Sequence, residues 1–175
     1  AAGALVLPPF FFKGVSDQGI IDGYRWVIDR VADPRLKLML YQIPQVTGVA
    51  LSHHVIRTLL DQYPGTIIGL KDSACQRDIS LAYAKAFMPP MQVWVGNEPD
   101  VPTMAGLGTL GAVSGVANVM PRLTRRLVEE HASPDIERHV QRMRDFIAIL
   151  GGYGMTAAFK GMMSILTGEP GWRRV

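Results

Sequence analysis

The sequence has 175 residues, of which 48% are hydrophobic and 19% are charged, a composition that excludes a disordered chain, collagen and a coiled coil. The length is sufficient for one domain with its own core. The net charge is only +3, and the basic residues are scattered apart from a cluster between Arg122 and Arg144, so we expect no nucleic-acid partner.

Short apolar runs rich in Leu, Val and Ile alternate with segments of helical spacing, which predicts an α/β fold with a parallel sheet. Each run is continuously apolar, so we expect strands that are buried on both faces. The five expected strands are 4–7, 36–40, 66–70, 92–95 and 111–116.

Three helices between and after these strands have readable ends. Ser52 is a candidate N-cap for a helix that Tyr63 and the following Pro-Gly end. Ser133 and Pro134 open a second helix, whose apolar residues recur every three or four positions as far as Leu150. A third helix follows over 155–166, so the sheet should finish near residue 116.

Two residues at expected strand ends are candidates for chemistry. Reactive side chains of parallel α/β folds gather at the carboxyl ends of the strands, where this sequence has Tyr41 and Lys71. A partly desolvated lysine favours the neutral amine, which attacks carbonyl carbons, and a phenol beside it can relay protons. Alternatively, Lys71 reaches into solvent and Tyr41 caps the core, but two such residues at neighbouring strand ends favour Schiff-base chemistry.

Other motifs give weaker signals. Residues 106–111 match G-x-G-x-x-G, but the expected helix precedes them and the expected strand follows, the reverse of a dinucleotide loop. His53 and His54 are adjacent and cannot share a metal as an i, i+4 pair can. Cys75 has no evident histidine partner and is interpreted as a buried, inert thiol. The Arg122 to Arg144 cluster alternates with acidic residues, which is typical of an exposed helical face or an oligomer contact rather than a phosphate site.

Four segments together resemble one family. They are LYQIPQVTG with Tyr41, IIGLKDSA with Lys71, VWVGNEPD and GAVSGVANVMP, and their order and spacing are similar to those of the dihydrodipicolinate synthase and N-acetylneuraminate lyase family. The resemblance implies a (β/α)8 TIM barrel, a Schiff base between Lys71 and pyruvate or another 2-oxo acid, and Tyr41 as proton relay. It implies no metal and no organic cofactor, and a homo-oligomer, either a dimer or a tetramer.

The resemblance also implies further site residues and a division of the chain. Thr47 and Gly48 would form the loop after Tyr41, and Ser114, Gly115 and Ala117 would place backbone near the substrate carboxylate. Residues 1–130 would supply strands four to eight of the barrel, and 131–175 a C-terminal helical region. Because the first three strands are missing, we expect the chain to be a fragment.

Two departures from the synthase pattern indicate which branch of the family applies. Phe10, Phe11 and Phe12 occupy the segment where synthases supply a tyrosine, and Gln45 and Val46 stand where synthases place an arginine for the aldehyde's carboxylate. We therefore expect a lyase or aldolase that joins or releases a 2-oxo acid and an aldehyde. The alternatives are a dihydrodipicolinate synthase, which condenses pyruvate with aspartate semialdehyde, and a truncated, non-catalytic member.

The expected location is the cytoplasm. A single cysteine excludes a disulfide framework and favours a reducing compartment. Proline interrupts the longest apolar runs before they reach the length of a membrane span, and no signal-peptide pattern opens the sequence. Because residue 1 is not methionine, we expect the chain to begin inside a mature sequence.

Overall fold

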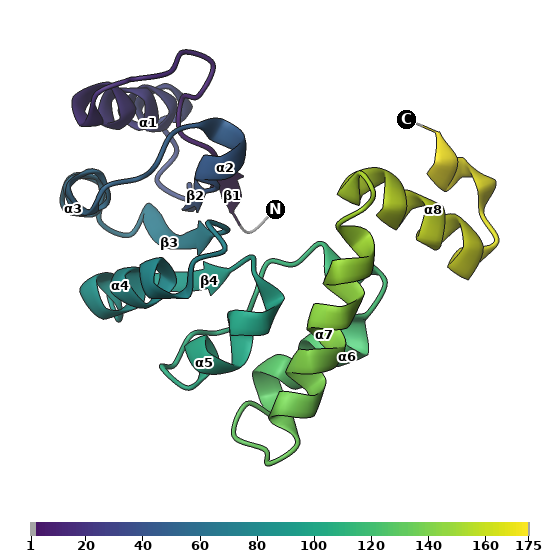
Figure 1. Ribbon diagram of the computed structural model, residues 1–175. Helices are drawn as coiled ribbons and strands as arrows, with labels where there is room; N and C mark the ends of the chain where they lie inside the picture. Colours follow the sequence, from purple (N-terminus) through teal and green to yellow (C-terminus); the bar gives the residue numbers. More distant parts are fainter. Residues whose placement is uncertain (1–2, 175) are drawn as a thin grey trace. The chain divides into compact units, whose positions relative to one another are not determined.

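The computed structural model describes residues 3–174 and divides the chain into two compact units (Figure 1). Unit 1 is Ala1–Gly96 and unit 2 is Asn97–Val175. Unit 1 holds a parallel sheet with helices, and unit 2 is helical. The α/β class expected from the sequence is confirmed. The expected boundary at residue 130, between the barrel part and the C-terminal helical region, stays a prediction.

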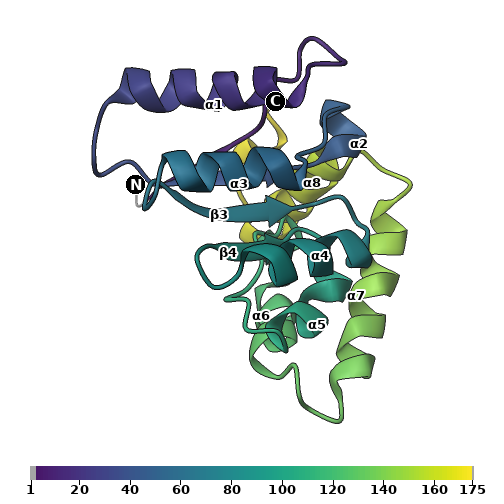
Figure 2. The same ribbon diagram turned by 90° about the vertical axis from the view of Figure 1, so that its left-hand side faces the viewer.

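The sheet of unit 1 contains four parallel strands in the order of the chain. They are β1 (Ala4–Val6), β2 (Leu38–Gln42), β3 (Ile67–Asp72) and β4 (Gln92–Val95). Helices α1 (Asp17–Val31), α3 (His53–Gln62) and α4 (Arg77–Phe87) lie on one face of this sheet, as Figures 1 and 2 show. The single-turn helix α2 (Pro44–Thr47) follows β2 directly. Four of the five expected strands are therefore confirmed, with ends shifted by at most two residues.

Burial alternates along β2 and β4, and Ile68 and Lys71 of β3 are only half-buried, so the expectation of two buried faces is wrong for this structure. On the face toward the helices, Leu38, Leu40 and Leu70 are at most 1% exposed. Their neighbours Tyr41 and Lys71 point the other way and are half-buried. The helices cover one face only, and side chains of successive strand residues point to opposite faces.

Serine caps fix the starts of two helices and join them. Ser16 accepts a hydrogen bond from the backbone N–H of Gly19 at the start of α1, and Ser52 accepts one from Val55 at the start of α3. The Ser52 hydroxyl also donates to the Asp17 carboxylate at 2.6 Å. This confirms the helix predicted after Ser52 and ties the N-terminal end of α3 to that of α1.

Unit 2 is built from α-helices and 3-10 helices and has buried apolar residues of its own. Its elements are η1 (Glu98–Asp100), α5 (Val101–Ala105), η2 (Val116–Asn118), α6 (Pro121–Glu129), α7 (Ile136–Leu150), α8 (Met155–Thr167) and η3 (Pro170–Arg173). Met104, Leu127 and Met143 are fully buried and join α5, α6 and α7. The helices predicted from Ser133 and over 155–166 are present, although α7 begins at Ile136 with Asp135 as its N-cap.

The fifth expected strand, 111–116, does not form. Only Ala112 takes part in a bridge, and the 3-10 helix η2 starts at Val116. Ser114 explains the change, because its hydroxyl accepts a hydrogen bond from the Ala117 N–H at 3.0 Å and turns the backbone out of an extended conformation. The apolar run is therefore a turn and not a strand.

Among the described residues, no single helix has both the length and the apolar character to cross a membrane. The pair α7 and α8 passes that test only when taken together, and the two helices are bent by 106° at their junction.

Candidate active site

Lys71 and Tyr41 meet on the face of the sheet opposite to the helices. The parallel register pairs Tyr41 on β2 with Lys71 on β3, so both side chains leave the sheet side by side. Lys71 Nζ donates a hydrogen bond of 3.0 Å to Tyr41 Oη, and it lies 4.3 Å from the centroid of the tyrosine ring. The two sequence candidates thus form a hydrogen-bonded amine and phenol at neighbouring strand ends.

Two glycines make room for the lysine and its neighbours. A Cβ on Gly96, at the end of β4, would lie 3.0 Å from Lys71 Cε and 2.0 Å from Ser73 Oγ. A Cβ on Gly69 would lie 2.2 Å from the ring of Trp94, the residue in register with Lys71. The aliphatic part of the Lys71 side chain therefore lies beside Gly96 and Ser73. The Trp94 ring covers Gly69, which lies two residues before Lys71 on the same face of β3.

Two buried polar residues, which the sequence analysis missed, support the loops that follow the strands. Gln42 comes directly after Tyr41, and its side-chain oxygen accepts a hydrogen bond from the Leu51 N–H at 2.8 Å. Asp72 comes directly after Lys71 and accepts hydrogen bonds from the Ala74 N–H and the Ser80 hydroxyl. The sequence did carry a signal for these two residues. A polar residue directly follows each candidate and therefore points to the opposite face of the strand, toward the helices.

Tyr83 on α4 belongs to the same buried network. Its hydroxyl donates to the Leu51 carbonyl oxygen at 2.6 Å. Burial raises the pKa of Tyr83 above its ordinary value, and the negative charge of Asp72 raises it further. The hydroxyl therefore keeps its proton and stays a donor to the loop after β2.

The turn after β2 holds Thr47 and Gly48, as the sequence predicts, but the hydroxyl of Thr47 is used within the turn. Thr47 is fully buried, and its Oγ1 lies 3.1 Å from the Ile43 carbonyl oxygen and 2.9 Å from that of Val49. Lys13, which the sequence analysis missed, holds the turn from outside. Its Nζ donates to the carbonyl oxygens of Thr47, at 2.5 Å, and Phe10, at 2.6 Å.

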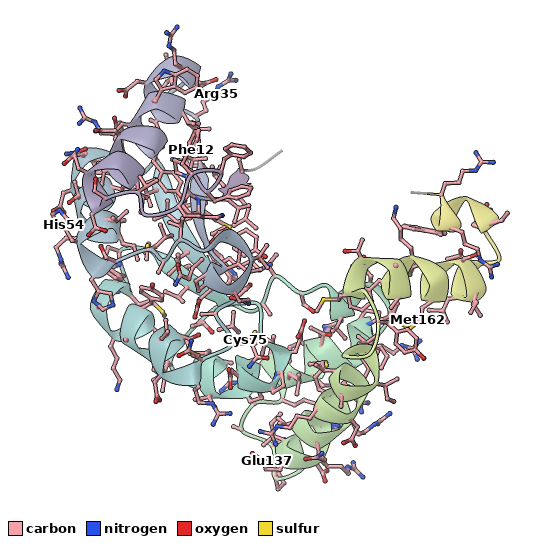
Figure 3. All side chains as sticks on the ribbon, turned by 45° about the horizontal axis from the view of Figure 1, so that its top comes forward. Phe12, Arg35, His54, Cys75, Glu137 and Met162 are labelled. Carbon is pink, nitrogen blue, oxygen red and sulfur yellow. The ribbon has the colours of Figure 1, made fainter. Side chains whose placement is uncertain are left out.

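Gln45 joins the same turn to the loop after β3, because its side-chain amide donates to the Ser73 carbonyl oxygen at 2.5 Å. Val46 next to it is 69% exposed and offers no charge. In the loop after β1, Phe11 and Phe12 are 85% and 76% exposed (Figure 3 labels Phe12). Among the positions where the sequence departs from the synthase pattern, Phe11, Phe12 and Val46 thus expose apolar side chains, and the Gln45 amide is held by the loop after β3.

The residues Ser114, Gly115 and Ala117 lie in unit 2, where they form one turn before η2. The Ser114 hydroxyl donates to the buried Glu98 carboxylate at 2.5 Å while it accepts from Ala117. Gly115 packs against the ring of Phe159 on α8. Glu98, a partner that sequence reasoning missed, therefore anchors this turn.

Two side chains outside this group also bear on the sequence analysis. Cys75, labelled in Figure 3, is exposed and has a left-handed backbone with φ +57°, so the expectation of a buried thiol is wrong. The His53 ring packs on the rings of Tyr83 and Phe87.

Within residues 3–174, no group of three or more His, Cys, Asp or Glu side chains is placed to hold a metal ion.

Comparison with known proteins identifies the family of the chain. The family model described as the dihydrodipicolinate synthetase family matches residues 1–166. The chain belongs to this family. It is 30% identical to an uncharacterised DapA-like lyase of Chloroflexus aurantiacus over 82% of this chain and 48% of the relative. It is 26% identical to N-acetylneuraminate lyase of Rattus norvegicus over 97% of this chain and 54% of the relative.

A solved structure extends the match to the fold. The crystal structure of dihydrodipicolinate synthase from Agrobacterium tumefaciens superposes with a TM-score of 0.85 and 30% identity, covering 98% of this chain and 57% of that one. The fold is thus part of a TIM barrel of the dihydrodipicolinate synthetase family. The chain spans about half the length of the relatives that it matches.

Proposed function

We propose that Lys71 forms a Schiff base with the carbonyl carbon of a 2-oxo acid such as pyruvate, and that the protein makes or breaks the neighbouring carbon–carbon bond. The observation that carries the proposal is the 3.0 Å hydrogen bond between Lys71 Nζ and Tyr41 Oη at the ends of paired strands. An amine nucleophile and a proton-transfer group within hydrogen-bond reach are what imine chemistry requires.

In the cleavage direction, the neutral Lys71 amine adds to C2 of a 2-oxo-4-hydroxy acid. The C2 oxygen takes up protons and leaves as water, which yields a protonated imine. The bond between C3 and C4 then breaks, because its electron pair can move into a C2–C3 double bond and neutralise the imine nitrogen. The 4-hydroxyl group loses its proton and the aldehyde departs. Protonation at C3 and addition of water at C2 release the 2-oxo acid and restore the amine.

Tyr41 is the group proposed to move these protons. Its hydroxyl lies beside the nitrogen, so it can protonate the departing oxygen and later accept the proton of the 4-hydroxyl group. The contacts predicted at Thr47, Gly48, Ser114, Gly115 and Ala117 remain part of the proposal. Because the Thr47 hydroxyl already bonds within its turn, we assign Thr47 a structural part there.

The lyase or aldolase branch is favoured by the side chains near the turn after β2. A synthase must hold the carboxylate of aspartate semialdehyde, whereas Val46 has no charge and the Gln45 amide already bonds to Ser73. Phe11 has no hydroxyl with which to relay a proton. The 30% identity to the Agrobacterium synthase keeps synthase activity as the second candidate, and a non-catalytic member is the third.

Reductive trapping tests the proposal directly. The purified protein is incubated with pyruvate and borohydride, and the labelled peptide is mapped by mass spectrometry. We expect irreversible labelling at Lys71 and none with Lys71→Met. Labelling at Lys13, Lys37, Lys85 or Lys160 instead, or no pyruvate-dependent mass at all, would refute the assignment.

A further inference from the structure

A second concave site lies in unit 2, and its lining contains neither Lys71 nor Tyr41. A pocket of about 420 Å³ opens beside the first turn of α6, and three arginines line it. Arg122 and Arg126 come from α6, and Arg142 comes from α7. The remaining wall is uncharged, and its residues are Val119, Met120, Pro121 and Leu123. The lining therefore includes three arginines and no acidic residue.

The sequence pattern favoured an exposed helical face or an oligomer contact over a phosphate site, because the arginines alternate with acidic residues, but at the pocket only one arginine is paired with an acidic residue. Arg126 forms an ion pair with Glu130 at 3.6 Å. Within residues 3–174, Arg122 and Arg142 have neither an ion pair nor a hydrogen bond from their side chains. On the outer side of the same helix, Arg125 is paired with Glu129 at 2.7 Å. Two of the three arginines that line the pocket are thus unpaired.

Placing these charges together is unfavourable unless an anion joins them. Arg122 and Arg126 are four residues apart and share one face of α6, where like charges repel. The backbone N–H groups of Arg122 and Leu123 precede the first intrahelical bond of α6, and no side chain caps this end. A helix end alone would hold an anion weakly, so the guanidinium groups carry the affinity.

We propose that this pocket binds the phosphate group of a small organic molecule. Guanidinium groups match the geometry of phosphate oxygens through paired hydrogen bonds, and several arginines around one pocket favour a dianion. The apolar wall of Val119, Met120 and Leu123 would contact the carbon body of the ligand. A volume of about 420 Å³ exceeds what a bare phosphate needs and lies in the range of ligand sites.

Calorimetric titration with inorganic phosphate and with glycerol phosphate, at constant ionic strength, tests the proposal. We expect saturable binding of both and tighter binding of glycerol phosphate. Arg122→Gln and Arg142→Gln should each weaken binding by roughly tenfold, as expected for the loss of one charge-assisted contact. Arg142→Lys keeps the positive charge but loses the paired N–H donors of the guanidinium group. Its affinity for phosphate should lie between those of Arg142→Gln and the parent protein.

Arg125→Gln is the matched control, because it removes an arginine from the same helix outside the pocket. It should bind phosphate like the parent protein, and circular dichroism should give the same helix content for all variants. Heats that do not saturate, or equal weakening in Arg125→Gln and Arg142→Gln, would overturn the site. Equal affinity for phosphate and glycerol phosphate would overturn the proposal that the apolar wall contacts the carbon body of the ligand. Pyruvate labelling is read at Lys71 and phosphate binding at the pocket arginines, so failure of the proposed function and failure of this proposal are distinguishable.

Discussion

Gly96 at the end of β4 determines how much space the Lys71 side chain has. In Gly96→Ala the new methyl group would meet Ser73 Oγ at 2.0 Å and Lys71 Cε at 3.0 Å. We expect the lysine to be displaced from Tyr41, with a loss of about 1–3 kcal/mol in the free energy of unfolding and slower trapping by pyruvate. Urea unfolding and the rate of borohydride-dependent labelling measure the two effects.

Gly152→Ala is the control for this change, since a Cβ at Gly152 has open space around it. It should leave both the unfolding midpoint and the labelling rate near those of the parent protein. If Gly96→Ala behaved in the same way, the close approach of Gly96 to Lys71 would have no consequence for the site.

Tyr41 is assigned to proton transfer, so its hydroxyl should matter more than its ring. Tyr41→Phe keeps the ring on the sheet and loses the hydrogen bond to Lys71. We expect turnover to fall by roughly a hundredfold or more, which is typical for loss of a general acid or base, with a small change in stability. Steady-state kinetics of aldehyde release and thermal unfolding provide the comparison.

Tyr63→Phe serves as the matched control, because its hydroxyl bonds to Asp29 and not to the candidate site. Its turnover should equal that of the parent protein. Undiminished turnover in Tyr41→Phe would instead show that the phenol only caps the sheet.

Residue-level prediction from the sequence succeeds where a strand end fixes the position. Lys71 and Tyr41 could be found because each follows an apolar run and the two runs pair in register. Gly96 and Ser73 could not, because their contact depends on how two loops from different strands meet. The bond between Lys13 and Thr47 joins residues far apart in the chain, and no local pattern indicates it.

Lys13 connects two loops, and its removal should loosen both. Lys13→Met keeps most of the aliphatic stem and deletes the hydrogen bonds to Phe10 and Thr47. We expect a loss of about 1–3 kcal/mol in the free energy of unfolding, since two carbonyl groups lose a charged donor. The Michaelis constant should rise more than the turnover number falls, because the turn at Thr47 shapes the site without reacting.

Lys85→Met on the exposed face of α4 is the control for the lost charge. It should unfold at the same urea concentration as the parent protein. A turnover number that falls while the Michaelis constant stays unchanged in Lys13→Met would contradict the positioning role.

Elements with strong local signals could be predicted, and those decided by competing contacts could not. The helix after Ser52 has a cap, an apolar stripe and a clear end, and it forms as expected. The run over 111–116 is equally apolar, yet the Ser114 hydroxyl captures a backbone N–H and the strand is lost. The sequence also did not indicate that only one face of the sheet is buried, because apolar residues occupy both faces of the strands.

For the whole protein, the choice between lyase and synthase can be tested with two substrates. We expect poor condensation of pyruvate with aspartate semialdehyde, because a missing arginine removes about 1.5–3 kcal/mol of carboxylate binding. Phe11 also lacks the hydroxyl of the proton relay. Together the two losses should slow the condensation by roughly two or three powers of ten. Cleavage of a neutral 2-oxo-4-hydroxy acid should be unaffected.

A coupled assay for pyruvate release, across sugar-derived and apolar substrates, is run beside the synthase assay. Replacing Val46 with arginine should raise condensation and leave cleavage of neutral substrates nearly unchanged. Efficient condensation by the parent protein, with no cleavage across the panel, would place the protein in the synthase branch.

The order of the strands in unit 1 has a consequence for how the protein folds. Each strand pairs with the next one along the chain, so that Val6 meets Leu40, Leu40 meets Leu70 and Leu70 meets Val93. Among these four strands, no pairing has to wait for a distant segment, and each new loop closure costs about as much entropy as the one before it. Folding of such a sheet can begin during synthesis, because β1 and β2 can pair before β3 leaves the ribosome. Lys71 then acquires Tyr41 as its neighbour when the third strand joins the sheet, before unit 2 has emerged from the ribosome.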